Sequence, residues 1–213
     1  MKNMKHLSPR IRVQDFLSDF VKGKSVLDVG CVEDGALAEN ADTWLHKNLA
    51  KTAGSLVGID ILESDVEILR KKGYNMVCGD AMTASLGQTF DVIVLGEIIE
   101  HVVDPGALLR NMRRHLNKDG ILVLTTPHPF FFFNVLITMF SKEKRFFHPD
   151  HTALFCPWTI TGMLRKTGYT LEECYYFTRS RKLRSLLSIL HLPVYGVIAM
   201  SMMAIAKPTA SEG

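Results

Sequence analysis

The 213-residue chain lacks several features that would assign it to a protein class directly. Its cysteines, at positions 31, 78, 156 and 174, form neither a C-x-x-C pair nor a zinc-binding spacing, so we expect small core or turn residues in a reducing compartment. No apolar run reaches the roughly 18 to 20 residues that a transmembrane helix needs. The polar, basic N-terminus is not followed by the apolar stretch of a secretory signal. These absences predict a cytoplasmic protein.

The chain also has little excess charge and no internal repeat. A net charge of +3 is too small to indicate nucleic acid as the partner. The composition, 47% hydrophobic and 22% charged, is ordinary for a globular protein, and the length suits one domain rather than two. We therefore expect a single domain over residues 1–213, with a helical N-terminal segment at 1–22 and variable insertions at 128–156 and 179–193.

Apolar strands alternate with amphipathic helices along most of the chain. The predicted strands cover residues 25–29, 56–60, 74–78, 90–95, 121–125 and 170–177, with a last strand within 195–206. The predicted helices cover residues 11–21, 35–50, 64–72, 105–116 and 158–166, and residues 117–120 are a predicted turn. Nearly continuous apolar strands are typical of parallel sheets that helices cover on both faces. The pattern predicts a doubly wound, mostly parallel α/β domain.

Acidic residues stand at the carboxyl ends of four predicted strands, which are Asp28, Asp60, Asp80 and Glu97. In an open doubly wound sheet, ligands bind beyond these strand ends. An acid at the end of the second strand suits the two hydroxyls of a ribose, and Asp80 could accept a hydrogen bond from an adenine amino group. The sequence therefore predicts an adenosine-containing ligand at this edge.

The turn after the first strand does not suit a dinucleotide. A dinucleotide fingerprint requires Gly-x-Gly-x-x-Gly, so that backbone can approach a pyrophosphate. Here the turn runs Gly-Cys-Val-Glu-Asp-Gly over residues 30–35, and its two acids would repel a pyrophosphate. A cationic adenosyl ligand fits this turn better than NAD.

The ordered series of motifs resembles the class I S-adenosylmethionine-dependent methyltransferases. The motifs are VLDVGC at 26–31, VGID at 57–60, CGD at 78–80, FDVIVLGEIIEH at 90–101 and the stretch 109–127. Within that class the chain is most similar to the ubiquinone-biosynthesis O-methyltransferases and to related glycan and natural-product methyltransferases. The resemblance covers residues 21–127 closely and 150–207 more loosely, and it implies a seven-stranded, Rossmann-like methyltransferase fold.

The resemblance also implies roles for individual residues. Gly30 would pack against the cofactor within a turn that includes Cys31 and Gly35, and Asp28 would orient the amino-acid end of the cofactor. Val32 departs from the family, which usually has a second glycine at that position.

The resemblance places the rest of the cofactor along the next strand ends. Asp60 would hold the ribose and Ile61 would flank the adenine. The remaining contacts would come from Asp80 and Ala81 at the adenine edge and from Leu95 and Glu97 beside the methionine.

Several side chains are candidates for the chemical step. A base is needed mainly for an alcohol acceptor, and the candidates are His101, His128 and His151. As an alternative, Glu97, Glu100 and His101 would share a helical face and could bind Mg²⁺, Mn²⁺ or Fe²⁺ together with a histidine of the His148-Pro-Asp-His151 stretch. We favour a site without metal and keep Glu97, Glu100, His101 and His151 as the alternative ligand set.

Two further segments are unusual. Four consecutive phenylalanines, residues 130–133, favour packing under an inserted loop, with an acceptor pocket, a dimer contact or a membrane surface as alternatives. The basic cluster within 179–184 precedes a short apolar pattern and favours a solvated loop, with peripheral membrane binding as the alternative.

The function expected from these observations is methyl transfer from S-adenosylmethionine to an oxygen atom of a small-molecule, glycan or lipid-linked acceptor. The alternatives are a metal-dependent RNA 2′-O-methyltransferase, a nucleotide-dependent oxidoreductase, and a module that binds the cofactor without turnover. The expected oligomeric state is a monomer or a homodimer.

Overall fold

The computed structural model describes residues 4–6, 12–32, 41–140, 149–178, 182, 185–186, 189–190 and 199–209. The elements up to the centre of the chain are β1 (Met4–His6), α1 (Val13–Phe20), β2 (Ser25–Val29), α2 (Leu45–Ala50), β3 (Ser55–Asp60), α3 (Glu63–Lys71), β4 (Met76–Cys78) and β5 (Phe90–Gly96). They are followed by α4 (Pro105–Arg114), β6 (Leu116–Pro127), α5 (Phe132–Phe140), α6 (Pro157–Lys166), β7 (Tyr169–Phe177) and β8 (Ser201–Pro208). None of these described helices is both long and apolar enough to cross a bilayer.

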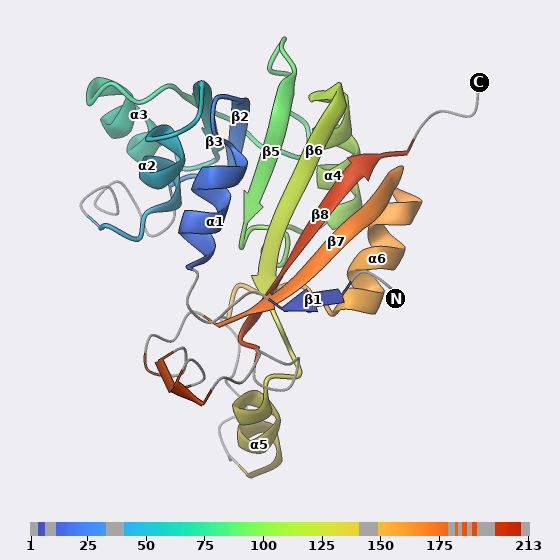
Figure 1. The fold of residues 1–213 in the computed structure, drawn as a ribbon. Helices are drawn as coiled ribbons and strands as arrows, with labels where there is room; N and C mark the ends of the chain where they lie inside the picture. Colours follow the sequence, from blue (N-terminus) through green and yellow to red (C-terminus); the bar gives the residue numbers. More distant parts are fainter. Residues whose placement is uncertain are drawn as a thin grey trace.

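One twisted sheet organises the described residues, with strand order β1-β7-β8-β6-β5-β2-β3-β4 (Figure 1). β2, β3, β4, β5 and β6 are parallel neighbours, and β8 runs antiparallel between β6 and β7. The seven predicted strands are therefore confirmed. The short β1 adds an eighth strand, parallel to β7, within the segment that was predicted to be only helical.

Alternate residues of the central strands enter two different cores, as the twofold repeat of a strand requires. On one face, Val26 and Val92 pack with α1 and with Leu49 of α2. On the other face, Leu27 and Ile93 pack with α4 and α6. Helices thus cover both faces of the sheet, which confirms the doubly wound α/β prediction.

Local boundaries differ from the predictions in two places. α2 begins only at Leu45, and residues 41–44 before it are not helical. Trp44 is fully buried there, and its indole N–H donates to the Cys31 carbonyl at 2.7 Å, so tertiary packing sets the start of the helix. The predicted turn at 117–120 is instead a bulge within β6, because Phe90 pairs with Leu116 while Val92 pairs with Ile121.

Candidate active site

The carboxyl ends of four adjacent parallel strands gather the predicted cofactor residues at one edge of the sheet. β5, β2, β3 and β4 are consecutive neighbours, and strands in a sheet lie about 4.8 Å apart. Backbone hydrogen bonds also join the residues that follow these strands. The Gly30 N–H after β2 donates to the Ile59 carbonyl of β3, and the Gly79 N–H after β4 donates to the Asp60 carbonyl of β3, each at 2.9 Å. Residues that follow these strands therefore share one rim.

Asp28 lies beneath this rim rather than on it. Its carboxylate is 2% exposed and lies 2.9 Å from Nδ1 of His46, which is equally buried on α2. Burial raises the pKa of the Asp28 carboxyl, although the hydrogen bond and charge of His46 oppose this effect. A Cβ on Gly58 would lie 2.6 Å from the Cys31 sulfur and 3.0 Å from the His46 ring, so that glycine leaves room for both side chains. The buried Asp28 carboxylate is therefore paired with His46, a partner that the sequence alone did not suggest.

The turn after β2 holds the Asp60 carboxylate in place. Gly30 has a φ of +72°, and a Cβ there would lie 2.9 Å from the Ile98 side chain, so both conformation and space favour glycine. Two residues later, the Val32 N–H donates to Asp60 Oδ2 at 2.9 Å, while the Leu62 N–H donates to Oδ1 at 3.1 Å. Val32 therefore orients the acid that is expected to hold the ribose, although it replaces a glycine of the family pattern.

The ends of β3 and β4 present an exposed apolar residue beside two polar turns. Ile61 is 68% exposed directly after Asp60, which leaves an open apolar surface for a ring such as adenine. The Asp80 carboxylate accepts the Met82 N–H at 2.8 Å and fixes the turn that contains Ala81. Asn111 of α4 donates to the Ala81 carbonyl at 3.0 Å, so the turn is anchored from both sides.

The two residues at the end of β5 that were predicted to contact the methionine, Leu95 and Glu97, have different surroundings. The Leu95 side chain is fully buried in the core. Glu97, in contrast, has a φ of +53°, the one positive value of a non-glycine residue in the described chain. Such a conformation costs energy and is concentrated at functional sites. Its N–H donates to the Thr125 carbonyl at 3.1 Å, which holds Glu97 at the strand end.

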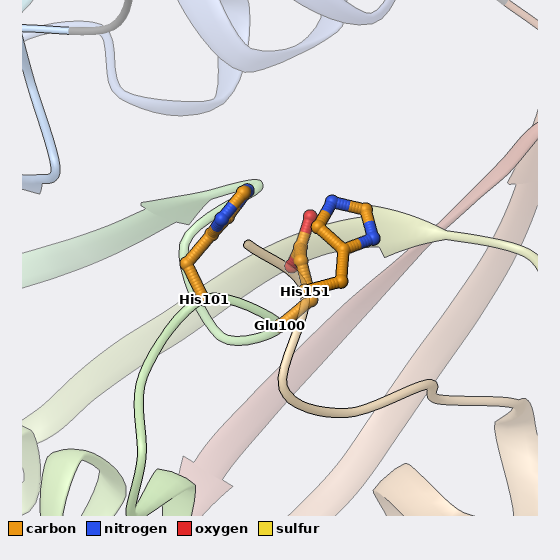
Figure 2. A group of neighbouring side chains, drawn as sticks. All are labelled: Glu100, His101 and His151. Atoms are coloured by element: carbon orange, nitrogen blue, oxygen red, sulfur yellow. The ribbon is translucent and has the colours of Figure 1, made fainter. Parts of the chain in front are cut away.

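Glu100, His101 and His151 form a cluster beside this strand end (Figure 2). Glu100 and His101 lie on the loop after β5, whereas His151 lies on the loop before α6. The two imidazole rings meet edge to face with centroids 4.6 Å apart, and one nitrogen or oxygen atom from each of the three side chains lies within 4.8 Å of the others. Two distant parts of the sequence thus converge on one polar cluster.

Threonines fix the geometry of this cluster. Glu100 is 1% exposed, and its Oε2 accepts the Thr126 hydroxyl at 3.0 Å. The Glu100 carbonyl accepts the Thr152 N–H at 2.8 Å, which fastens the loop next to His151. Neither threonine was singled out from the sequence, because only the folded loops bring them to Glu100.

The predicted helical face of Glu97, Glu100 and His101 is wrong. Residues 97–102 form a turn, in which the His101 N–H donates to the Ile98 carbonyl at 3.0 Å. The left-handed backbone at Glu97 breaks any helical continuation from that residue. Glu97 is consequently not in the described cluster, so three of the four alternative metal ligands converge and the fourth does not.

His128 has a different environment from the other two candidate bases. It is 2% exposed, and its ring lies edge to face with Tyr176 at 5.0 Å and near Phe130 at 5.8 Å. Its backbone N–H donates to the Met200 carbonyl at 2.9 Å. The structure therefore brings His101 and His151 together and leaves His128 in an aromatic surrounding.

Some predicted features lie outside the described residues. They are Gly35, His148 and most of the basic cluster at 179–184. The expectation that the phenylalanine run packs under a loop is wrong for three of its members, since Phe130, Phe132 and Phe133 are at least half exposed.

A separate hollow lies at the opposite end of the sheet. It is lined by Arg110, Arg113, Arg114, Lys118, Lys207 and Thr209, among others. These residues lie near the start of β6 and the end of β8, and none is a predicted site residue. The strand-end rim, with its acids and histidines, is the better candidate for chemistry.

The family described as "Methyltransferase domain" matches residues 5–174. Among curated relatives, the chain is 25% identical to a ubiquinone biosynthesis O-methyltransferase of Hydrogenovibrio crunogenus, over 75% of this chain and 68% of the relative. It is 26% identical to a mitochondrial protein of the same name from Bos taurus, over 84% of this chain but only 44% of that protein.

Solved structures show the same fold. Magnesium protoporphyrin IX methyltransferase from Synechocystis PCC 6803, solved with bound SAH, superimposes with a TM-score of 0.61 at 15% identity, covering 91% of this chain and 80% of that chain. The CcbJ methyltransferase from Streptomyces caelestis gives a TM-score of 0.64 at 14% identity, covering 92% and 88%. The match of the family over most of the chain, together with this fold, excludes the oxidoreductase alternative. The chain belongs to the methyltransferase domain family and is an S-adenosylmethionine-dependent methyltransferase.

Proposed function

We propose that the protein methylates an oxygen atom of a small-molecule acceptor, of the class that includes glycans and lipid-linked phenols or alcohols. The relatives named as ubiquinone biosynthesis O-methyltransferases support an oxygen acceptor. S-adenosylmethionine supplies an electrophilic methyl group to such a site. The residues of the chain then have three tasks: to hold the cofactor, to align the acceptor, and to accept the proton that the hydroxyl loses.

We assign cofactor binding to the rim of the sheet. Asp60, held by two backbone N–H groups, would accept hydrogen bonds from the ribose, and the exposed Ile61 would flank the adenine. Asp80 and Ala81 would bound the adenine edge, and Glu97 would stand on the methionine side. Gly30 lets the turn pack against Ile98, because a Cβ there would lie 2.9 Å from that side chain, and the bare backbone of this turn would contact the cofactor.

We assign proton transfer to His101 and His151. The observation that carries this assignment is the convergence of both imidazoles with Glu100 beside the end of β5. Imidazole has an ordinary pKa near 6.5, so it can accept a proton at neutral pH. The buried Glu100, fixed by Thr126, would orient the pair and stabilise the positive charge that forms when a proton is taken up.

Methyl transfer from labelled S-adenosylmethionine to a panel of catechols, phenols and polyprenyl phenols tests the proposal. We expect kcat for the best acceptor to fall by about 100-fold or more in His101→Gln and His151→Gln, which is the usual contribution of a general base. His128→Gln is the matched control and should stay within a few-fold of the wild type. A loss in His128→Gln alone, with the other two variants fully active, would transfer the role of base to His128.

The same experiment tests the metal alternative. One carboxylate and two imidazoles suit an ion such as Mn²⁺, Fe²⁺ or Zn²⁺ better than Mg²⁺. If a chelator abolishes activity and Mn²⁺ restores it, Glu100, His101 and His151 act as ligands rather than as a base pair. Under our proposal, dialysis against a chelator leaves kcat unchanged. Transfer to RNA but to no small molecule would favour the RNA methyltransferase alternative.

A further inference from the structure

The helix α5 is apolar and yet buries none of its side chains. It contains no charged residue, and its sequence is FFNVLITMF. Phe132, Phe133 and Phe140 are 50%, 56% and 78% exposed. Its threonine does not create a polar face, because the Thr138 hydroxyl donates to the Asn134 carbonyl of the same helix at 2.7 Å. Helices that are apolar all round are normally buried, so an exposed one indicates a binding surface.

A second exposed apolar group belongs to the same end of the molecule. Leu186, Ile189 and Leu190 are 52%, 73% and 53% exposed, and the Leu190 N–H donates to the Leu186 carbonyl at 3.0 Å, as in a helical turn. Figure 1 shows this turn and α5 beyond the carboxyl-terminal tips of β5 and β6. We refer to Phe130, α5, Leu186, Ile189 and Leu190 together as the apolar tip.

The charge of the sequence around the apolar tip is strongly positive. Residues 128–149 and 178–200, which flank the tip in the sequence, contain seven lysines and arginines and a single acid, Glu143, whereas the whole chain has a net charge of only +3. These cations include Lys142, Lys144 and Arg145 directly after α5, and the basic cluster of residues 179–184 directly before Leu186. Because a second copy of the same tip would bring like charges together, the charge favours an anionic partner.

The length of α5 limits what such a partner can be. Nine helical residues extend about 14 Å, which is less than half of the roughly 30 Å hydrocarbon core of a bilayer. The helix can therefore enter only the boundary between lipid headgroups and acyl chains. Phenylalanines and leucines with nearby lysines and arginines are the composition that binds at this boundary.

We infer that the apolar tip docks on an anionic lipid bilayer. Its phenylalanines would enter the acyl boundary, while the neighbouring lysines and arginines would contact lipid phosphates. Since the tip lies beyond the same strand ends that carry the histidine cluster, docking would turn the active site toward the membrane. This last consequence rests on the proposed function and points to an acceptor with an apolar tail, drawn from the bilayer.

Sedimentation with lipid vesicles tests the inference without any turnover. Vesicles of phosphatidylcholine alone are compared with vesicles that also contain phosphatidylglycerol. We expect the wild-type protein to sediment with the anionic vesicles and to be released by raised salt. The double variant Phe133→Ser/Phe140→Ser should lower the partition coefficient by about tenfold or more. Lys182→Glu, which replaces an exposed cation by an acid, should lower the partition coefficient by a smaller factor.

Ile68→Ser is the matched control. Ile68 is a 43% exposed apolar residue of α3, away from the apolar tip, so its loss should leave vesicle binding unchanged. Circular dichroism and S-adenosylmethionine binding confirm that each variant is folded. Absence of wild-type protein from anionic vesicles, or equal loss of binding in Ile68→Ser, would overturn the inference.

A dimer formed through the apolar tip would also contradict the inference. If analytical ultracentrifugation finds a dimer that Phe133→Ser/Phe140→Ser dissociates, and vesicles bind neither form, the apolar tip contacts a second copy instead. Failure of the proposed function is distinguishable, because a protein that binds vesicles but methylates no acceptor would leave the docking surface intact.

Discussion

At the scale of single residues, the buried pair of Asp28 and His46 is the feature that most constrains the site. Both side chains are 2% exposed, and Asp28 stands two residues before Gly30 at the end of β2. Removing two charged or polar groups from water is costly, so each partner depends on the other. Asp28 is therefore a buried carboxylate with His46 as its partner, and the expectation that it orients the amino-acid end of the cofactor stays a prediction.

Replacing His46 with leucine should destabilise the fold strongly. Asp28 would lose its partner in an apolar surrounding, and breaking a buried pair typically costs about 3 to 5 kcal/mol. Urea denaturation monitored by circular dichroism measures the change in the free energy of unfolding. The double variant Asp28→Asn/His46→Leu is the control, and it should recover part of the loss because no buried charge is left. A loss below about 1 kcal/mol in His46→Leu would show that the pair is unimportant.

At the scale of elements, Asp91 joins the starts of three strands. Its carboxylate accepts the Ser25 N–H at 2.9 Å and the Ser25 hydroxyl at 2.8 Å from β2, and the Asn117 amide at 2.7 Å from the bulge of β6. These hydrogen bonds, first the Ser25 N–H and then the two side chains, lower the pKa of Asp91 below its ordinary value. The charged form of this residue thus stabilises the folded sheet.

The stability of the sheet should accordingly depend on pH through Asp91. A carboxyl with a lowered pKa in the folded state stabilises above its unfolded pKa, near 3.9, and loses this contribution as the pH falls through the folded value. Asp91→Asn should lower the free energy of unfolding by about 1 kcal/mol at pH 7, because solvent partly screens this half-buried group. The difference from the wild type should shrink as the pH falls below about 3.9 and through the lowered pKa of the folded state. Asp119→Asn replaces an exposed acid in the same bulge and is the control, which should leave the free energy of unfolding at pH 7 unchanged.

The elements were largely predictable because the strands are apolar runs separated by glycine and proline. β2 and β5 agree with their predicted ranges to within one residue. β1 was not predictable, since three residues with one apolar side chain carry no periodic signal and are defined only by pairing with β7. The start of α2 was missed because the buried Trp44 outweighs the helical pattern around it.

At the scale of the whole molecule, the acidic rim was predictable because parallel strands end at one edge. Asp60 and Asp80 carry this signal in the sequence, as acids directly after apolar runs. The cluster of Glu100, His101 and His151 was only partly predictable, because the distance between residues 101 and 151 along the chain conceals their contact. The exposure of α5 could not be predicted, since an apolar run is equally typical of a segment in the core and of an exposed binding surface.

The central claim is that this rim binds the adenosyl cofactor through Asp60. Calorimetric titration of S-adenosylmethionine into the wild type, Asp60→Ala and the control Glu63→Ala, an exposed acid of α3, tests it most directly. The wild type and Glu63→Ala should bind equally, and Asp60→Ala should bind about 100-fold more weakly because two charge-assisted hydrogen bonds to the ribose are lost. Binding of equal strength by folded Asp60→Ala, or binding of NAD and not S-adenosylmethionine by the wild type, would contradict the claim.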